Sequence, residues 1–66
     1  MRVYINGEAQ DFTEAGTVAA LVEQFALNIR KVAVEVNQAI IPRSLYGQTV
    51  LHEGDAIEIV QFIGGG

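Results

Sequence analysis

The sequence predicts a small α+β fold, in which a mixed sheet of four or five strands carries one main helix on one face. Several short runs alternate polar and apolar residues, which is the period of a strand. One stretch instead repeats its apolar residues at the spacing of an amphipathic helix. This stretch follows two strands and precedes the others, an order that lets the helix cover one face of a single sheet.

The chain begins with a predicted β-hairpin. Residues 2–5 alternate polar and apolar side chains, and Asn6-Gly7 follows them. Both turn residues tolerate the positive φ that a two-residue hairpin loop requires. We therefore expect a second strand over residues 8–12, whose short and mostly polar sequence suits an edge of the sheet.

A helix is predicted after this hairpin. Thr17 is a suitable N-cap, because its hydroxyl can accept a hydrogen bond from an amide of the first turn. The apolar residues that follow fall at i, i+3, i+4 and i+7, namely Val18, Leu21, Val22 and Phe25. The helix is expected to end near Leu27 and Asn28, since asparagine adopts the left-handed conformation of a C-terminal cap more readily than most residues.

Two further strands are predicted after the helix. Residues 32–36 alternate again, with β-branched side chains on one face. Asn37-Gln38 then turns the chain into a strand over residues 39–41. Pro42 ends that strand because it has no amide proton to donate.

The remaining third of the chain predicts turns and the last strand. Residues 44–47 indicate a 3₁₀ or irregular turn, and residues 49–51 a further short strand. Gly54 is expected to supply positive φ in a turn between Glu53 and Asp55. The last strand is predicted from residue 56 to about residue 63.

The pleat of these strands divides their side chains between two faces. We expect the helix to cover Val3, Ile5, Val34, Val36, Ile57 and Ile59. The opposite face then carries Tyr4, Glu58, Val60 and Phe62. This arrangement is the ubiquitin-like β-grasp plan, with a predicted domain over residues 1–63 and a flexible glycine tail over residues 64–66.

Charge and composition narrow the functional class. Four Lys and Arg stand against eight Asp and Glu in 66 residues, and the net charge of −4 would repel nucleic acid. With no cysteine and one histidine, the chain offers neither a redox pair nor an obvious metal site, and His52 beside Glu53 is most simply a solvated turn pair. No apolar run is long enough to span a membrane and no signal-type segment begins the chain, so we expect a cytoplasmic protein. Because the chain has no cysteine nucleophile and its one serine has no obvious base, we expect that it is not itself an enzyme.

The most distinctive feature is the end of the sequence, where a β-forming run gives way to Gly64, Gly65 and Gly66. Glycine has no Cβ, so such a tail can lie extended in a narrow tunnel and present an unhindered terminal carbonyl. The competing interpretation is a frayed terminus with nothing to pack. A cysteine-free β-grasp pattern whose last strand leads directly into the glycines favours a functional tail, with the carboxyl carbon of Gly66 as its reacting atom.

Over essentially its whole length the sequence resembles the ThiS family, the sulfur carriers of thiamin thiazole biosynthesis. The resemblance is carried by Val34-Glu35-Val36-Asn37, Ile41-Pro42-Arg43, Leu51-His52-Glu53-Gly54-Asp55, Ile57-Glu58-Ile59-Val60 and Phe62-Ile63-Gly64-Gly65-Gly66. It implies that an E1-like enzyme, which itself binds ATP, adenylates the terminal glycine, and that sulfur from a donor protein displaces AMP. Thiazole synthase would then take the sulfur from the thiocarboxylate, and the carrier would hold no cofactor.

The resemblance also implies roles for particular residues. Gly66 would carry the adenylate and then the thiocarboxylate, while Gly64 and Gly65 would thread the tail into the partner. Many relatives end in two glycines, so Gly64 need not be essential. Arg43 matches the Pro-Arg step of the family and is a candidate docking residue. The alternative interpretation is that Arg43 is an ordinary surface cation near a turn.

An apolar patch for docking is predicted from the pleat. Tyr4, Val60 and Phe62 fall on the outer face of the sheet, where a partner of the tail could bind them. Exposed apolar residues are common on protein surfaces, and Phe62 could equally cover an edge of the sheet.

Three other functions compete with the thiamin carrier. The small subunit of molybdopterin synthase has the same fold and also ends in a glycine pair, but the short chain and the Pro42-Arg43 step favour the thiamin carrier. A ubiquitin-like interaction module would bind through its sheet and would not need the glycine terminus. An RNA-binding β-grasp module would need a basic face, and the chain has only four Lys and Arg to build one.

Overall fold

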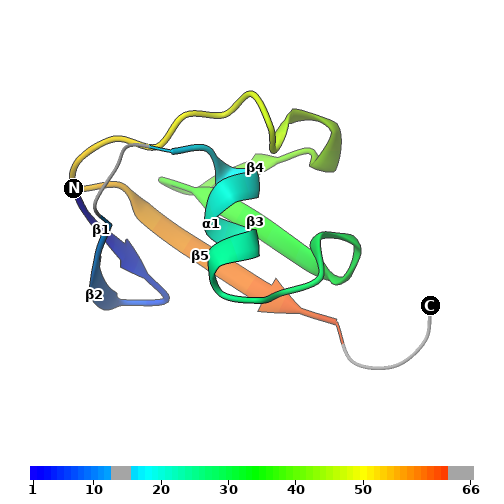
Figure 1. Ribbon diagram of the computed structural model, residues 1–66, viewed down its shortest axis with the longest axis horizontal. Helices are drawn as coiled ribbons and strands as arrows, with labels where there is room; N and C mark the ends of the chain where they lie inside the picture. Colours follow the sequence, from blue (N-terminus) through cyan, green and yellow to red (C-terminus); the bar gives the residue numbers. More distant parts are fainter. Residues whose placement is uncertain (13–15, 63–66) are drawn as a thin grey trace.

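The computed structural model describes residues 1–12 and 16–62, which form a five-stranded mixed sheet with one α-helix across one face (Figure 1). The strands are β1 (Arg2–Ile5), β2 (Glu8–Asp11), β3 (Val32–Val36), β4 (Ala39–Ile41) and β5 (Ala56–Gln61). The helices are α1 (Val18–Gln24) and the short 3₁₀ helices η1 (Ile29–Lys31) and η2 (Arg43–Leu45). Most predicted strand bounds are confirmed to within one residue, and β5 is described as ending at Gln61.

The strand order in the sheet is β2-β1-β5-β3-β4. The last strand in sequence, β5, is therefore the central strand in space, parallel to β1 and antiparallel to β3. The short strands β2 and β4 lie at the two edges, as predicted for residues 8–12. This topology confirms the predicted β-grasp fold, and it places the strand that leads towards the glycines between two neighbours.

Both hairpins close through left-handed two-residue turns. Asn6 and Gly7 have φ values of 51° and 86°, and Asn37 and Gln38 have values of 51° and 72°. Positive φ at both positions is the geometry of the turn whose twist matches that of the flanking strands. Gly54 also adopts positive φ, at 85°, as the turn before β5 requires.

The start of α1 is as predicted, but its end is not. The Thr17 side chain accepts a hydrogen bond from Ala20 N at 3.2 Å, and the helix then stops at Gln24 rather than near Leu27 and Asn28. The left-handed residue beyond it is Ala26, with φ of 57°. The helix ends early because the chain must leave it for Leu27 to pack against the core.

Asn28 has a different role from the predicted C-terminal cap. Its side chain accepts a hydrogen bond from Arg30 N at 2.9 Å, so it caps the start of η1. An asparagine with extended backbone geometry is a good N-cap for the same reason that serine or aspartate is. Asn28 therefore begins the next element instead of ending α1.

The predicted strand over residues 49–51 is also wrong, because Val50 forms only an isolated bridge with Thr17. Val18 N donates to Thr49 O, and Leu51 N donates to Gly16 O, each at 2.9 Å. These backbone groups bond to the segment that enters α1 and not to the sheet. Leu51 is consequently buried as part of the core.

The hydrophobic core lies between α1 and the inner face of the sheet. Its buried residues are Val3, Val18, Leu21, Val22, Val32, Val34, Tyr46, Leu51 and Ile57. The six inner-face residues predicted from the pleat are all buried or packed against this cluster. Tyr46 joins the core from the segment after η2, and its hydroxyl lies 3.3 Å from Val32 O. Within the described ranges, no helix is both long and apolar enough to cross a membrane.

Candidate functional site

The predicted tail follows β5 in the sequence, so the end of this strand is the described part of the structure nearest to it along the chain. Gln61 pairs with Val32 of β3, and one residue further Phe62 N donates a hydrogen bond to Lys31 O at 2.7 Å. Hydrogen bonds therefore hold the chain to the β3 side through Phe62, one residue beyond the end of β5. Gly64, Gly65 and Gly66, the predicted threading and reacting residues, lie outside the described residues, as do residue 63 and the predicted boundary there.

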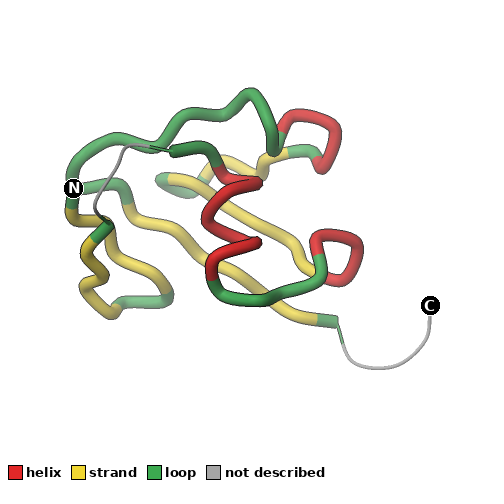
Figure 2. The backbone as a smooth tube through the Cα atoms, viewed as in Figure 1, coloured by secondary structure: helices red, strands yellow, loops and turns green. Residues whose placement is uncertain are grey.

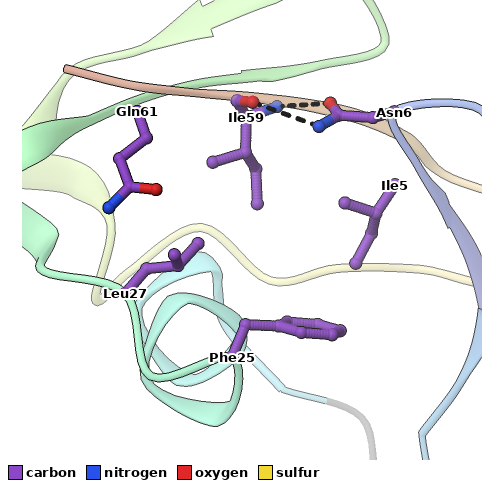
Figure 3. A pocket seen from close by; sticks show the side chains of 6 residues that line it. All are labelled: Ile5, Asn6, Phe25, Leu27, Ile59 and Gln61. Carbon is purple, nitrogen blue, oxygen red and sulfur yellow. Dashed lines mark hydrogen bonds between the residues drawn. The ribbon is translucent and has the colours of Figure 1, made fainter. Parts of the chain in front are cut away.

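The other side of β5 is held by a side chain. Asn6 Nδ2 donates to Ile59 O at 3.2 Å, and Ile59 N donates to Asn6 Oδ1 at 2.8 Å (Figure 3). The side-chain amide of Asn6 thereby extends the hydrogen bonding between β1 and β5 by one residue beyond Ile5, where β1 ends. The sequence predicted Asn6 only as a turn residue, since no local pattern indicates a contact with a residue 53 positions away.

A shallow hollow of about 280 Å³ lies beside this contact, between the end of α1 and the sheet. Its lining residues are Ile5, Asn6, Phe25, Leu27, Ile59 and Gln61 (Figure 3). The ring of Phe25 also meets Phe12 edge to face, with 6.2 Å between their centroids. The lining is mostly apolar and includes no titratable side chain, so these residues provide no acid, base or nucleophile.

The predicted docking residues are exposed, but they do not form one patch. Val60 and Phe62 are 57% and 50% exposed and lie two residues apart on the same side of the chain, near the end of β5. Tyr4, which is 43% exposed, pairs with Ala56 at the start of that strand. Tyr4 therefore lies about 13 Å from Val60 along β5, at about 3.3 Å per residue, with Glu58 between them.

Arg43, the other predicted docking residue, begins η2 and reaches across to η1. Its Nη2 donates to Arg30 O at 3.0 Å. Lys31, the next residue of η1, accepts the hydrogen bond from Phe62 N. Three cationic residues thus come together where β5 ends.

His52 lies far from this region, in the turn that precedes β5. Its ring is exposed, with Nδ1 4.0 Å from Asp55 Oδ2, and its backbone amide donates to the same carboxylate oxygen at 2.8 Å. The exposed turn position predicted for His52 is confirmed, but its predicted pairing with Glu53 is wrong, because its partner is Asp55 and Glu53 accepts a hydrogen bond from Arg2 N. Over residues 1–12 and 16–62, no three His, Cys, Asp or Glu residues gather as metal ligands would.

Comparison with known proteins decides the family. The model of the ThiS family matches residues 3–66. The chain belongs to the ThiS family. The resemblance seen in the sequence is thereby confirmed over all but the first two residues.

Several named proteins are similar to this ThiS-family chain. It is 33% identical to the sulfur carrier protein ThiS of Escherichia coli K12, over the full length of both chains. It is 48% and 42% identical to thiazole synthases of Paramagnetospirillum magneticum and Magnetococcus marinus. All of the chain matches in both cases, but it spans only 20% of the length of each of those proteins.

A solved structure supports the fold as well as the family. The crystal structure of the thiamine biosynthesis protein ThiS from Geobacter metallireducens superposes with a TM-score of 0.85 and 29% identity. The match covers 100% of both chains. The β-grasp arrangement around β5 is therefore that of a ThiS protein throughout.

Proposed function

We propose that this ThiS-family chain carries sulfur as a thiocarboxylate on Gly66 and delivers it for thiazole synthesis. The observation that carries the proposal is the placement of β5, a central strand held on both sides that ends three residues before the first terminal glycine in the sequence. The full-length similarity to a ThiS sulfur carrier supports it independently. The 1–63 domain would be the handle and residues 64–66 the tail that enters partner enzymes.

The chemistry requires activation by a partner, because a carboxylate is a poor electrophile. In the proposed first step, a carboxylate oxygen of Gly66 attacks the α-phosphorus of ATP bound to an E1-like enzyme, and pyrophosphate leaves. Sulfide delivered by a donor protein then attacks the acyl carbon and expels AMP, so that a C–S bond replaces a C–O bond. The carrier contributes an unhindered glycine and no catalytic side chain.

Recognition is assigned to the surface around the end of β5. Val60 and Phe62 offer exposed apolar side chains there, and Arg43 offers a cation nearby. Apolar side chains at the centre of an interface with charges at its rim are the usual composition of docking surfaces. Tyr4, at the opposite end of β5, would contact only a partner that extends along the outer face of the sheet.

Activation is tested with the purified chain, the E1-like enzyme and sulfur donor of the same organism, and ATP. We expect the intact mass to rise by the difference between one sulfur and one oxygen atom. A chain lacking Gly65 and Gly66 is the matched control and should not react. An unchanged mass, under conditions in which the Escherichia coli ThiS protein is converted, would contradict the proposal.

The receiving enzyme is tested separately, since a molybdopterin synthase carrier would undergo the same activation. The similarity to two thiazole synthases favours the thiazole pathway. The thiocarboxylated chain should lose its sulfur to thiazole synthase and not to the large subunit of molybdopterin synthase. Transfer to the molybdopterin enzyme alone would reverse the assignment.

A further inference from the structure

Three of the four Lys and Arg residues of this chain lie on the η1 side of the end of β5. Lys31 is placed there by the hydrogen bond from Phe62 N to its carbonyl oxygen, at 2.7 Å. Arg43 is placed there by the bond from its guanidinium to Arg30 O, at 3.0 Å. Residues 30, 31 and 43 are all exposed. We call these three residues the basic pole.

The acidic residues are distributed differently. The fourth cation, Arg2, lies near the start of β5, where it forms an ion pair with Asp11 at 3.0 Å. Glu53 Oε1 accepts a hydrogen bond from Arg2 N, and Asp55 immediately precedes β5. The N-terminal ammonium lies at this end as well, where it donates to Phe12 O at 2.8 Å. The three acidic side chains still outnumber these two cations, in a chain whose net charge is −4.

The central strand separates the two charged regions. The turn before β5 lies beside the start of β1, whereas η1 lies at the other end of β5 (Figure 2). Six residues of extended strand span about 20 Å, at about 3.3 Å per residue. That separation exceeds the screening length of about 8 Å at physiological ionic strength, so an approaching surface experiences each end largely on its own.

The basic pole has no acidic partner in the described part of the chain. Among the described residues, Asp11 pairs with Arg2, and Asp55 lies 4.0 Å from the His52 ring; neither contact involves residues 30, 31 or 43. The acidic residues nearest along β3 and β5 are Glu35 and Glu58, which are paired with each other three residues before the end of β5. The positive charge at the end of β5 is therefore available to another molecule.

We propose that the basic pole docks on an acidic protein surface bordering the channel of the E1-like enzyme that receives the glycine tail. This inference rests on the proposed function, because it assigns the pole to the partner that activates Gly66. An acidic surface repels a chain of net negative charge except where the basic pole faces it. Attraction at that pole therefore orients the carrier with the end of β5 forward, and it accelerates encounter more than it tightens the complex.

The test compares two variants that lower the net charge by the same amount. The double substitution Arg30→Gln and Lys31→Gln weakens the basic pole, while Arg2→Glu adds negative charge at the opposite end of β5. The charged groups of Arg30 and Lys31 form no hydrogen bond among the described residues. Circular dichroism checks that both variants fold. Association with the E1-like enzyme is followed by stopped-flow fluorescence across a range of salt concentrations.

We expect the double variant to associate about tenfold more slowly than the original chain at low salt, with the difference shrinking as salt is added. Its KM for activation should rise while kcat stays unchanged. Arg2→Glu should associate within about twofold of the original rate, because its added charge is remote from the docking end. Equal slowing of both variants would show that only net charge matters and would overturn the inference.

Two further outcomes separate the alternatives. Saturable binding of ATP to the carrier alone, abolished in the double variant, would make the pole a nucleotide site and overturn its assignment to a protein surface. If the original chain binds the E1-like enzyme with this dependence on charge but never gains sulfur, the proposed function fails while the docking surface stands. If it gains sulfur and the double variant associates normally, the docking inference alone fails.

Discussion

Asn6 combines two roles that are usually performed by different residues. Its backbone adopts the positive φ of the hairpin turn, and its side chain exchanges two hydrogen bonds with the backbone of Ile59. Glycine would satisfy the first role and not the second. Asparagine is therefore suited to this position by more than its tolerance of the left-handed region, and the turn becomes part of the support of β5.

The two roles of Asn6 are separated by substitution. Asn6→Gly keeps the turn but removes both side-chain bonds, and we expect the free energy of unfolding to fall by about 1–2 kcal/mol. Asn6→Ala should cost roughly 1 kcal/mol more, because alanine is strained at positive φ. Urea denaturation of the three chains measures both differences. A glycine variant as stable as the original would show that the contacts with Ile59 contribute nothing.

The ion pair of Arg2 with Asp11 makes a small contribution that depends on pH. The hydrogen bond and positive charge of Arg2 lower the pKa of Asp11 below its ordinary value of 3.8. A carboxylate with a lowered pKa stabilises the folded state above that ordinary value, and the stabilisation is lost as pH falls through the lowered pKa. Both side chains are exposed, so the effect is that of a surface pair.

Asp11→Asn tests this pair. The substitution should slightly lower stability at neutral pH and have no effect at a pH well below the pKa of Asp11, where the original carboxyl group is protonated as well. Thermal unfolding of both chains between neutral pH and about pH 2 gives the comparison. A difference that grows as the pH falls would contradict the pairing.

At the scale of the elements, the sequence predicts the five strands of the sheet and both hairpin turns because their signals are local, but it wrongly predicts a strand over residues 49–51. Alternation in residues 2–5, 32–36 and 56–61 identifies strands without knowledge of their neighbours. The end of α1 was missed because Ala26, a residue type that seldom adopts positive φ, occupies the left-handed position. Tyr46 and Leu51 were missed as core residues because irregular segments have no period from which burial can be inferred.

Only some of the predicted docking residues lie together in the structure, because alternation along one strand says nothing about neighbouring strands. The pleat correctly placed Val60 and Phe62 on the outer face, because it depends only on alternation along β5. Alternation does not give the lateral register between strands, and that register places Tyr4 opposite Ala56, far from Val60. The contact of Arg43 with Arg30 joins two loops and has no signal in the sequence.

The unusual end of α1 makes a prediction about Ala26. Ala26→Gly should raise the free energy of unfolding by about 0.5–1 kcal/mol, because relief of left-handed strain exceeds the added flexibility of the unfolded chain. Ala20→Gly, on the exposed side of α1, is the matched control and should lower it by about 1 kcal/mol. Urea denaturation again gives both values, and destabilisation by Ala26→Gly would contradict the assigned geometry.

At the scale of the whole molecule, the fold supports β5 from both sides. Its neighbours are β1 and β3, while the exposed edges of the sheet are formed by β2 and β4. A partner that binds residues beyond β5 therefore pulls on the centre of the sheet, where hydrogen bonds on both flanks must break before the strand is released. Under the proposed function this support matters, because the carrier would have to keep its fold while successive enzymes bind its end.

The central claim is that sulfur is attached at Gly66, and fragmentation of the activated intact chain in a mass spectrometer tests it most directly. We expect every fragment containing Gly66 to gain the difference between sulfur and oxygen, and fragments ending before Gly66 to keep their original mass. A mass gain in fragments that lack Gly66 would show that sulfur is attached elsewhere.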